Sequence, residues 1–137
     1  MEPRHERLDP LALLVEELGS RVVHPVVAAV DAGFDPFDGP VTVVQVTSSA
    51  PAGRLTRWCF HVSVTVMTFA VDPATAFEAH GSVADSLLEL TTVGGGDVLV
   101  SSVLAVQEPV DMPVRSATDW PGQLSRYTLY LRRKGSR

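Results

Sequence analysis

Hydrophobic and polar residues alternate most regularly in the run RWCFHVSVTVMTFAV, from Arg57 to Val71. Alternate positions form one largely apolar face: Trp58, Phe60, Val62, Val64, Val66 and Ala70. The positions between them form a second, more polar face: Cys59, His61, Ser63 and Thr65. A period of two predicts a half-buried strand. At about 3.3 Å per residue the run would reach ~50 Å, so we expect part of it to project beyond the core or to pair with a neighbouring subunit.

Two segments have the spacing of amphipathic helices. Asp9 and Pro10 are typical of a helix start, and apolar residues recur after them: Leu11, Leu14, Val15, Leu18 and Val22. Asp72 and Pro73 begin a second helix. Its predicted inward stripe is Phe77, His80, Gly81, Ala84, Leu87 and Leu88, and its outward residues are Glu78, Asp85 and Glu89. We interpret Val22 to Val30, which contains Pro25, as a kinked continuation of the first helix; a separate helical turn is the alternative.

Three further segments are rich in β-branched or alternating residues and predict strands: Val41 to Thr47, Asp97 to Val106, and Arg126 to Arg132. Tyr127, Leu129 and Leu131 should share one face of the last strand. Glycine, proline and polar residues predict connections elsewhere: a loop over Ala32 to Pro40, a turn over Ser48 to Leu55, a helix exit at Gly94 to Gly96, and an irregular segment over Gln107 to Leu124.

The order helix, two strands, helix, two strands predicts one α+β domain over residues 1–137. We expect a mostly antiparallel four-stranded sheet with the helices packed on one face. Residues 1–8 should form a flexible N-terminus, and residues 132–137 a basic C-terminal tail. There is no long apolar run and no signal-peptide pattern, so a protein made inside the cell and free of membranes is expected.

Charge is distributed unevenly along the chain. The formal net charge is −5, but four of the eleven basic residues are Arg132, Arg133, Lys134 and Arg137. The preceding 131 residues carry a balance of −9. An acidic body with a basic tail disfavours sequence-specific nucleic-acid binding, which needs a basic face. The tail can contact an acidic neighbour, including another copy of the chain, or DNA passing nearby; a solvated terminus is the simpler interpretation.

The residues that could carry chemistry form no recognisable catalytic pattern. His5, His24, His61 and His80 are scattered, without the spacing of a metal site, and we expect neither a metal nor a cofactor. Cys59 cannot form a disulfide within this chain, because it is the single cysteine. His61 and Ser63 share a strand face, but no nucleophile elbow surrounds the serine. Gly94 to Gly96 follow a helix and precede a strand, the reverse of a phosphate loop.

The layout resembles the tail terminator (tail completion) proteins of long-tailed bacteriophages of the siphophage type. The resemblance lies in the first helix from Leu11, the VTVVQV strand, the long strand ending at Val71, the helix sequence DPATAFEAHGSVADSLLEL, and Trp120-Pro121 before an apolar strand. It covers roughly residues 9 to 133 and is a pattern of order and composition. Where many such proteins have glycines after the first strand, this chain has Thr47, Ser48 and Ser49.

This resemblance implies a virion structural protein at the head-tail junction, assembled in the host cytoplasm. Such a protein forms a homohexameric ring that caps the tail tube, stops its polymerisation and offers a docking surface to the head-completion (connector) protein, while DNA passes through the lumen. We expect subunit or partner contacts at Ser48 to Leu55, Glu108 to Leu124 and Arg132 to Arg137. Candidate interface residues are Ser48, Ser49, Pro51, Arg54, Trp120, Arg132, Arg133, Lys134 and Arg137.

Two alternatives remain open at this point. The chain could be another head-tail connector or a minor tail protein of similar size. It could instead be a small α+β enzyme or ligand-binding module in which Cys59, His61 or Ser63 lines a pocket between helix and sheet. Trp120 is either a residue that holds its own loop down or an interface anchor.

Overall fold

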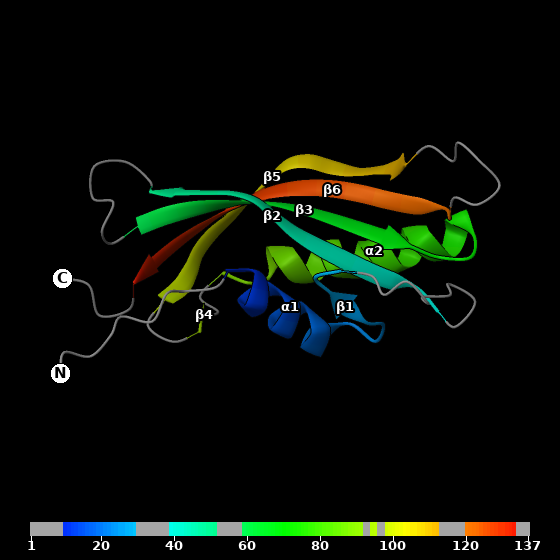
Figure 1. The fold of residues 1–137 in the computed structure, drawn as a ribbon, viewed down its shortest axis with the longest axis horizontal. Coiled ribbons are helices and arrows are strands. Elements are labelled where there is room, and N and C mark those ends of the chain that lie inside the picture. The colour runs from blue at the N-terminus through cyan, green and yellow to red at the C-terminus, as the bar shows by residue number, and fades with distance from the viewer. Residues whose placement is uncertain are drawn as a thin grey trace.

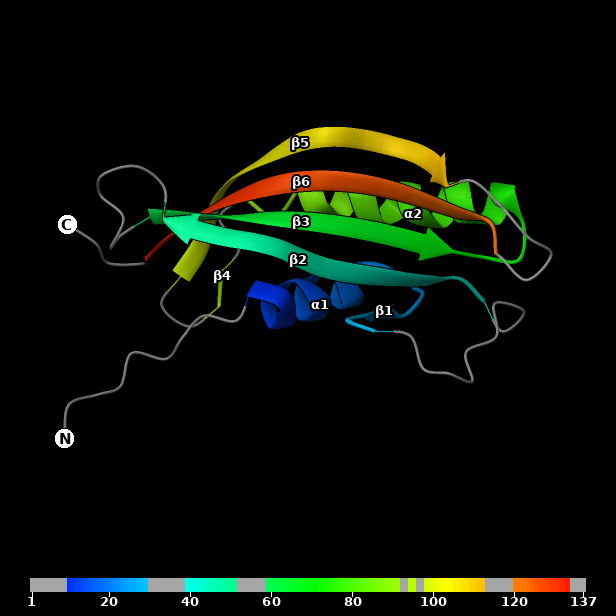
Figure 2. The ribbon, with the colours of Figure 1, turned by 45° about the horizontal axis from the view of Figure 1, so that its top comes forward.

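The computed structural model describes residues 10–29, 39–51, 59–91, 94–95, 98–112 and 120–133. Figures 1 and 2 show two helices beneath one face of a twisted sheet, whose opposite face carries no helix. The elements are α1 (Pro10–Arg21), β1 (Val26–Val27), β2 (Val41–Pro51), β3 (Cys59–Phe69), α2 (Pro73–Leu88), β4 (Gly94–Gly95), β5 (Val98–Met112) and β6 (Gly122–Arg133). The predicted α+β class, with both helices on one face, is confirmed.

The sheet has six strands in the order β1-β2-β3-β6-β5-β4. The four predicted strands correspond to β2, β3, β5 and β6, which pair antiparallel. The predicted count of four was wrong because two short strands extend the sheet. β1 runs parallel to β2, and β4 pairs antiparallel with β5. The sheet is therefore mixed.

Both short strands replace structure that the sequence predicted differently. The segment from Val22 was expected to continue the helix, but the chain bends after Arg21 and the Pro25 carbonyl accepts a hydrogen bond from the Thr42 amide at 3.0 Å. Proline has no N–H to donate to a helical hydrogen bond, which disfavours a continued helix here. The Pro25 carbonyl is satisfied by the bond from β2 instead. Gly94 and Gly95 were expected in a helix exit; they pair instead with Leu99 and Val98.

The extents of β3 and β5 also differ from the prediction. β3 covers 11 residues rather than fifteen, and each of them pairs with a residue of β6. It is a central strand of the sheet, flanked by β2 and β6. β5 continues to Met112 although it contains Pro109. Its register shifts between Gln107 and Val110, and proline is tolerated at such irregular positions of a strand next to the sheet edge.

The predicted connections are shorter than expected. Ser48 to Pro51 belong to β2 and pair with β3, so they are not a turn. Residues 107–112 belong to β5 and residues 122–124 to β6, so the irregular connection over Gln107 to Leu124 was also wrong at both ends. Residues 1–9, 30–38, 52–58, 113–119 and 134–137 lie outside the described residues, and with them the predicted N-terminus, the loop before Gly39, Trp58, Arg54, Lys134 and Arg137.

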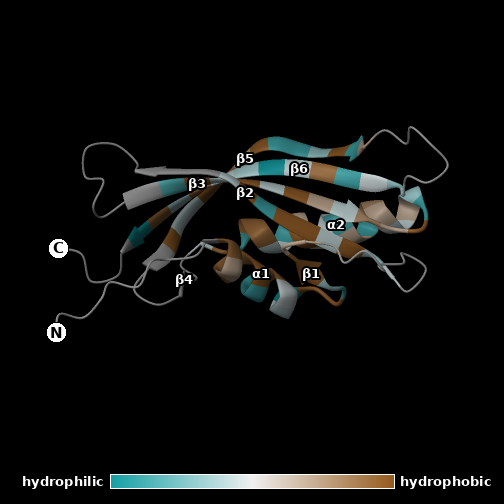
Figure 3. Cartoon of the chain, viewed as in Figure 1, coloured by the Kyte–Doolittle hydropathy of each residue, from teal (hydrophilic) through white to brown (hydrophobic). Residues whose placement is uncertain are grey.

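The core lies between the helices and the facing side of the sheet. β3 contributes Val62, Val64 and Val66, which are almost fully buried, as the alternation predicted. Figure 3 shows hydrophobic residues on α1 and on β2 where the two elements approach each other. The remaining core residues come from the helices and neighbouring strands: Leu13, Leu14, Leu18, Val26, Val44, Val83, Ala84, Leu87, Leu90, Val100, Tyr127, Leu129 and Leu131. Each buried aliphatic side chain contributes roughly 1.5–3 kcal/mol.

Candidate interaction surface

Large apolar side chains are exposed on α2 and on β5, the strand beside it. Phe77 and Leu88 on α2 are 65% and 50% exposed, and Leu104, Val106 and Val110 on β5 are 55%, 61% and 43% exposed. Leu104 and Val110 pair with Thr128 and Leu124, which alternate with buried residues of β6 and so point to the helix-free face, whereas Phe77 and Leu88 line a groove on the helix side. The five residues, which thus flank β5 on both of its faces, are called the β5–α2 surface below. Isolated exposed apolar residues are ordinary, but several on neighbouring elements are typical of an interaction site.

A rotation of α2 about its axis explains why Phe77 and Leu88 are exposed. The buried residues of α2 include Ala76, His80, Val83 and Leu87, which recur at helical spacing toward the sheet. The predicted inward stripe, Phe77, His80, Gly81, Ala84, Leu87 and Leu88, includes some of these buried residues but extends too far around the helix. Phe77, Gly81, Ala84 and Leu88 share one helix face, but that face lines a groove beside β5 instead of facing only the core. The prediction was therefore wrong for Phe77 and Leu88 and right for His80, Ala84 and Leu87.

The groove between α2 and β5 has a volume of ≈ 220 Å³. Its lining residues are Phe77, Gly81, Ala84, Asp85, Leu88, Ala105, Glu108, Pro109, Gln123 and Tyr127. The only ionisable carboxyl groups among them are Asp85 and Glu108, and no lysine or arginine is present in this set. The groove therefore combines apolar walls with a negative charge.

Tyr127 gives the groove a buried polar group. Its side chain is 2% exposed, and its hydroxyl has no hydrogen-bond partner among the described residues. Burial raises the pKa of the Tyr127 phenol; the nearby Ser125 side chain opposes the shift, and the charges of Asp85 and Glu108 add to it. An unpaired buried hydroxyl costs about 1–3 kcal/mol, which a polar partner in the groove would recover.

The backbone of β5 limits how this edge can bind. Among the described residues, β4 covers β5 only at Val98 and Leu99. Beyond that point the register of β5 against β6 shifts three times, and Pro109 provides no N–H. Bulges and proline are devices by which edge strands avoid pairing with further strands. The β5–α2 surface is therefore suited to side-chain contacts rather than to the addition of a strand.

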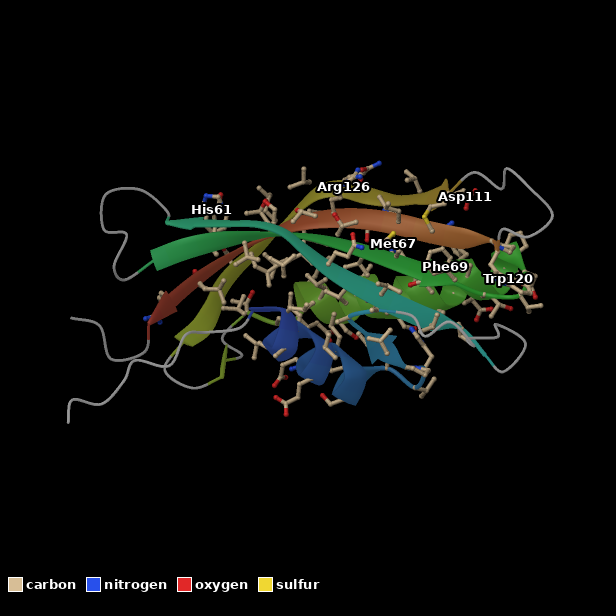
Figure 4. All side chains as sticks on the ribbon, in the orientation of Figure 1. His61, Met67, Phe69, Asp111, Trp120 and Arg126 are labelled. Atoms are coloured by element: carbon tan, nitrogen blue, oxygen red, sulfur yellow. The ribbon has the colours of Figure 1, made fainter. Side chains whose placement is uncertain are left out.

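The helix-free face of the sheet carries the residues that the enzyme alternative invoked. His61 and Ser63 alternate with buried Val62 and Val64, so they point away from the helices. They cannot line a pocket between helix and sheet, and that expectation was wrong. The His61 ring packs against Tyr130, with ring centroids 5.9 Å apart. Figure 4 shows His61 near one end of the sheet, and Asp111 and Trp120 near the other.

The rest of the helix-free face carries both polar and apolar side chains. Arg126, in the middle of β6, donates a hydrogen bond to the side-chain oxygen of Gln107. Met67 and Phe69 lie further along β3, opposite Leu124 and Gly122. Gln123 points to the helix side and donates to the Asp111 carboxylate. These contacts tie β5 to β6 at the end where β5 is irregular.

A chain of buried hydrogen bonds crosses the core beneath α2. His24 Nε2 lies 2.8 Å from Thr42 Oγ1, which lies 2.7 Å from Thr68 Oγ1. Thr68 Oγ1 lies 2.8 Å from His80 Nδ1, and His80 Nε2 lies 2.7 Å from Ser125 Oγ. A neutral imidazole donates at one nitrogen and accepts at the other. The four bonds therefore run in one direction along the chain, so that the hydroxyls of Thr42 and Thr68 each accept one bond and donate another.

Burial fixes the protonation state of this chain. Desolvation lowers the pKa of His80 to about 4, and the neighbouring His24 adds to the shift. Burial also lowers the pKa of His24. His80 and Ser125 are fully buried, so this histidine-serine pair is enclosed in the core and does not meet solvent. It joins α2 to β3 and β6, and its chemistry is that of a structural network.

Sequence reasoning placed His80 on the inward face of α2 but missed its partners. These partners could have been found from the sequence, because they are polar residues at strand positions that face the core. Thr68 continues the apolar face of Val62, Val64 and Val66, and Ser125 continues that of Tyr127 and Leu129. Such interruptions on a core face indicate a buried polar network, because buried hydroxyls need partners.

The structure separates the predicted interface residues into two groups. Ser48, Ser49 and Pro51 pair with β3 near the end where Arg132 pairs with Cys59. Arg133, next to Arg132, pairs with Val98. Trp120 lies at the opposite end, before β6, and is 37% exposed. The predicted interface residues thus lie at the two ends of the sheet. The predicted contact segment Glu108 to Leu124 did include Val110 and the groove residues Glu108, Pro109 and Gln123. Nothing in the sequence indicated the rest of the β5–α2 surface.

Comparisons with known proteins give no match to any protein-family model or curated protein. In the part of the chain that the structure describes, no group of three or more histidine, cysteine, aspartate or glutamate residues is placed to hold a metal ion. Neither described helix has the length and apolar character needed to cross a membrane.

Proposed function

We propose that this chain is a structural protein of a phage tail, of the tail terminator type, and that the β5–α2 surface is a contact between subunits of its ring. The observation that carries the proposal is the group of exposed apolar residues on α2 and on the two faces of β5, Phe77, Leu88, Leu104, Val106 and Val110. Covering such residues with a neighbouring subunit removes apolar area from water, at roughly 25 cal/mol per Å².

A ring places two requirements on each subunit. One patch must meet a different patch on the next copy, and the rotation between copies must close after a fixed number. The β5–α2 surface supplies one patch. The end of the sheet that holds Pro51 and Arg132 supplies a second, chemically different patch, because the exposed cation of Arg132 lies there while the groove is acidic. Two unlike patches on one domain support head-to-tail assembly.

In this function the ring caps the tail tube, stops its polymerisation and receives the head-completion protein on its other side. DNA passes through the lumen, and the −9 balance of residues 1–131 disfavours its retention there. The protein acts in the virion at the head-tail junction after assembly in the host cytoplasm. Its mechanism is binding between surfaces, with no reaction and no cofactor.

The experiment is size-exclusion chromatography and negative-stain imaging of the purified chain, alone and with tail tubes of the phage that carries it. Rings of six, or particles bound at tube ends with tube growth arrested, support the proposal. Binding to a head connector without any effect on tubes would favour a connector protein instead. A stable monomer that neither forms rings nor binds tube ends would overturn the proposal.

A further inference from the structure

We infer that the groove between α2 and β5 receives the basic segment Lys134 to Arg137 of a second copy of this chain. The inference rests on the proposed function, because it names the partner of the β5–α2 surface. Three independent properties of the groove select such an occupant. They are its unbalanced negative charge, its apolar walls and the unpaired hydroxyl of Tyr127.

Charge is the first argument. Asp85 on α2 and Glu108 on β5 are both exposed and line the same groove, and no basic residue lines it. The segment after β6 reads Lys134-Gly135-Ser136-Arg137 and contains no acidic residue. Two cations entering beside two carboxylates complement the charge of the groove, and such complementarity determines which surfaces associate.

The shape and polarity of the groove give the second argument. Lysine and arginine have long aliphatic stems that pack on apolar surface while the charged end reaches a polar group. Phe77 and Leu88 provide apolar wall for the stem, and Asp85 and Glu108 accept hydrogen bonds from the charged end. The Tyr127 hydroxyl can accept a further bond, which satisfies a group that has no partner within the described part of the chain.

Reach excludes the same molecule as the donor of this segment. Arg133 pairs with Val98, ten positions before Glu108 on β5. Because the register of β5 shifts against β6, that separation corresponds to about eight residues of β6, or roughly 26 Å. Arg137 is four residues beyond Arg133, a span of at most ~14 Å when fully extended. The basic segment that fills the groove must therefore come from another copy, and in a ring this contact between unlike patches repeats head-to-tail.

A charge exchange tests the recognition. Asp85→Lys with Glu108→Lys should weaken self-association at least about tenfold, and Lys134→Glu with Arg137→Glu should do the same. The four substitutions combined in one chain should restore association to within about threefold of wild type. The matched control, Glu16→Lys with Glu78→Lys, makes the same charge change at exposed positions outside the groove and should leave association unchanged. Association is measured by analytical ultracentrifugation, with thermal melting to verify folding.

A disulfide test locates the contact. In a Cys59→Ser background, one tagged chain carries Ala105→Cys in the groove wall and a differently tagged chain carries Arg137→Cys. Oxidation of the mixture should give disulfide-linked pairs that contain both tags. The control replaces Ala105→Cys by Ser20→Cys on exposed α1, which should give few mixed pairs.

The outcomes separate this inference from the proposed function. Rings that form normally without the mixed disulfide, or without sensitivity to the Asp85 and Glu108 substitutions, would overturn the inference and leave the ring intact. Mixed disulfides together with restored association in the exchanged chain support the inference even where the protein fails to cap tail tubes, and in that case the proposed function alone fails.

Discussion

Asp85 on α2 and Glu108 on β5 line one groove, and the charges of both carboxylates act on Tyr127 between them. They are 23 positions apart in the sequence and come together because α2 packs under the sheet beside its β5 side. Neither residue stands out in the sequence, where both belong to ordinary polar positions. Their juxtaposition gives the molecule an acidic, apolar-walled edge that the chain's own basic segment complements.

The rotation of α2 predicts different effects for two adjacent leucines. Leu87→Ala should lower the free energy of unfolding by about 2–5 kcal/mol, because Leu87 is fully buried in the core. Leu88→Ala should lower it by less than about 1 kcal/mol, because half of that side chain is exposed. Urea denaturation of both variants checks this difference. Equal losses would mean that the predicted inward stripe, and not the observed rotation, describes α2.

His80 predicts a dependence of stability on pH. Its pKa is about 4 in the folded protein, below the ~6.5 of an unfolded chain, so protonation favours unfolding. Its contribution is complete above pH ~6.5 and is lost as the pH falls toward 4. The loss amounts to about 3 kcal/mol at most. Urea unfolding of wild type and His80→Asn between pH 4 and 8 measures the slope.

The His80→Asn variant should be less stable than wild type at neutral pH, because Thr68 and Ser125 lose a hydrogen-bond partner in the core. Its stability should then fall less steeply than that of wild type over the acidic range. Parallel curves for the two proteins would show that the pKa of His80 is not lowered in the folded protein, contrary to its burial in the network.

Gly122 predicts a steric limit at the start of β6. A Cβ at this position would overlap the methyl group of Met112 and lie 3.0 Å from the Thr68 carbonyl oxygen and 3.1 Å from Phe69 Cδ1. Gly122→Ala should therefore destabilise the protein by about 1–3 kcal/mol. Met112→Ala in the same chain should restore part of this loss, since it removes the flexible neighbour but not the backbone oxygen. Thermal melting of both variants checks the order; a neutral Gly122→Ala would contradict the packing.

Particular residues show what the sequence could predict. The alternation of Val62, Val64 and Val66 correctly predicted the buried face of β3, because the sheet buries only one of its faces. Asp72 caps α2 as predicted, and its carboxylate accepts a hydrogen bond from the Thr75 amide at 2.7 Å. The continuation of β5 past Pro109 was not predictable from propensity, because proline is tolerated there only by the edge position and the bulges. These depend on contacts with β6, far along the chain.

The candidate surface was less predictable than the fold. A stripe of Phe77, Gly81, Ala84 and Leu88 satisfies the helical period as well as the true core stripe does, and the two differ by one residue. Only the position of β5 beside α2 decides between them. The hydrogen-bond chain through Thr68 and Ser125 likewise joins residues 57 positions apart, although their places on core faces were a signal that polar partners were needed.

The central claim is that the β5–α2 surface joins subunits of a closed ring. Its most direct test compares wild type, Val106→Asp and Val23→Asp. Native mass spectrometry counts the subunits in each assembly, and negative-stain imaging shows whether each protein occupies tail-tube ends. Val106 and Val23 are both exposed, so each substitution should leave folding intact, and only Val106 belongs to the surface. We predict closed rings of six copies for wild type and Val23→Asp, and monomers that leave tube ends bare for Val106→Asp. Rings of Val106→Asp indistinguishable from those of wild type would contradict the claim.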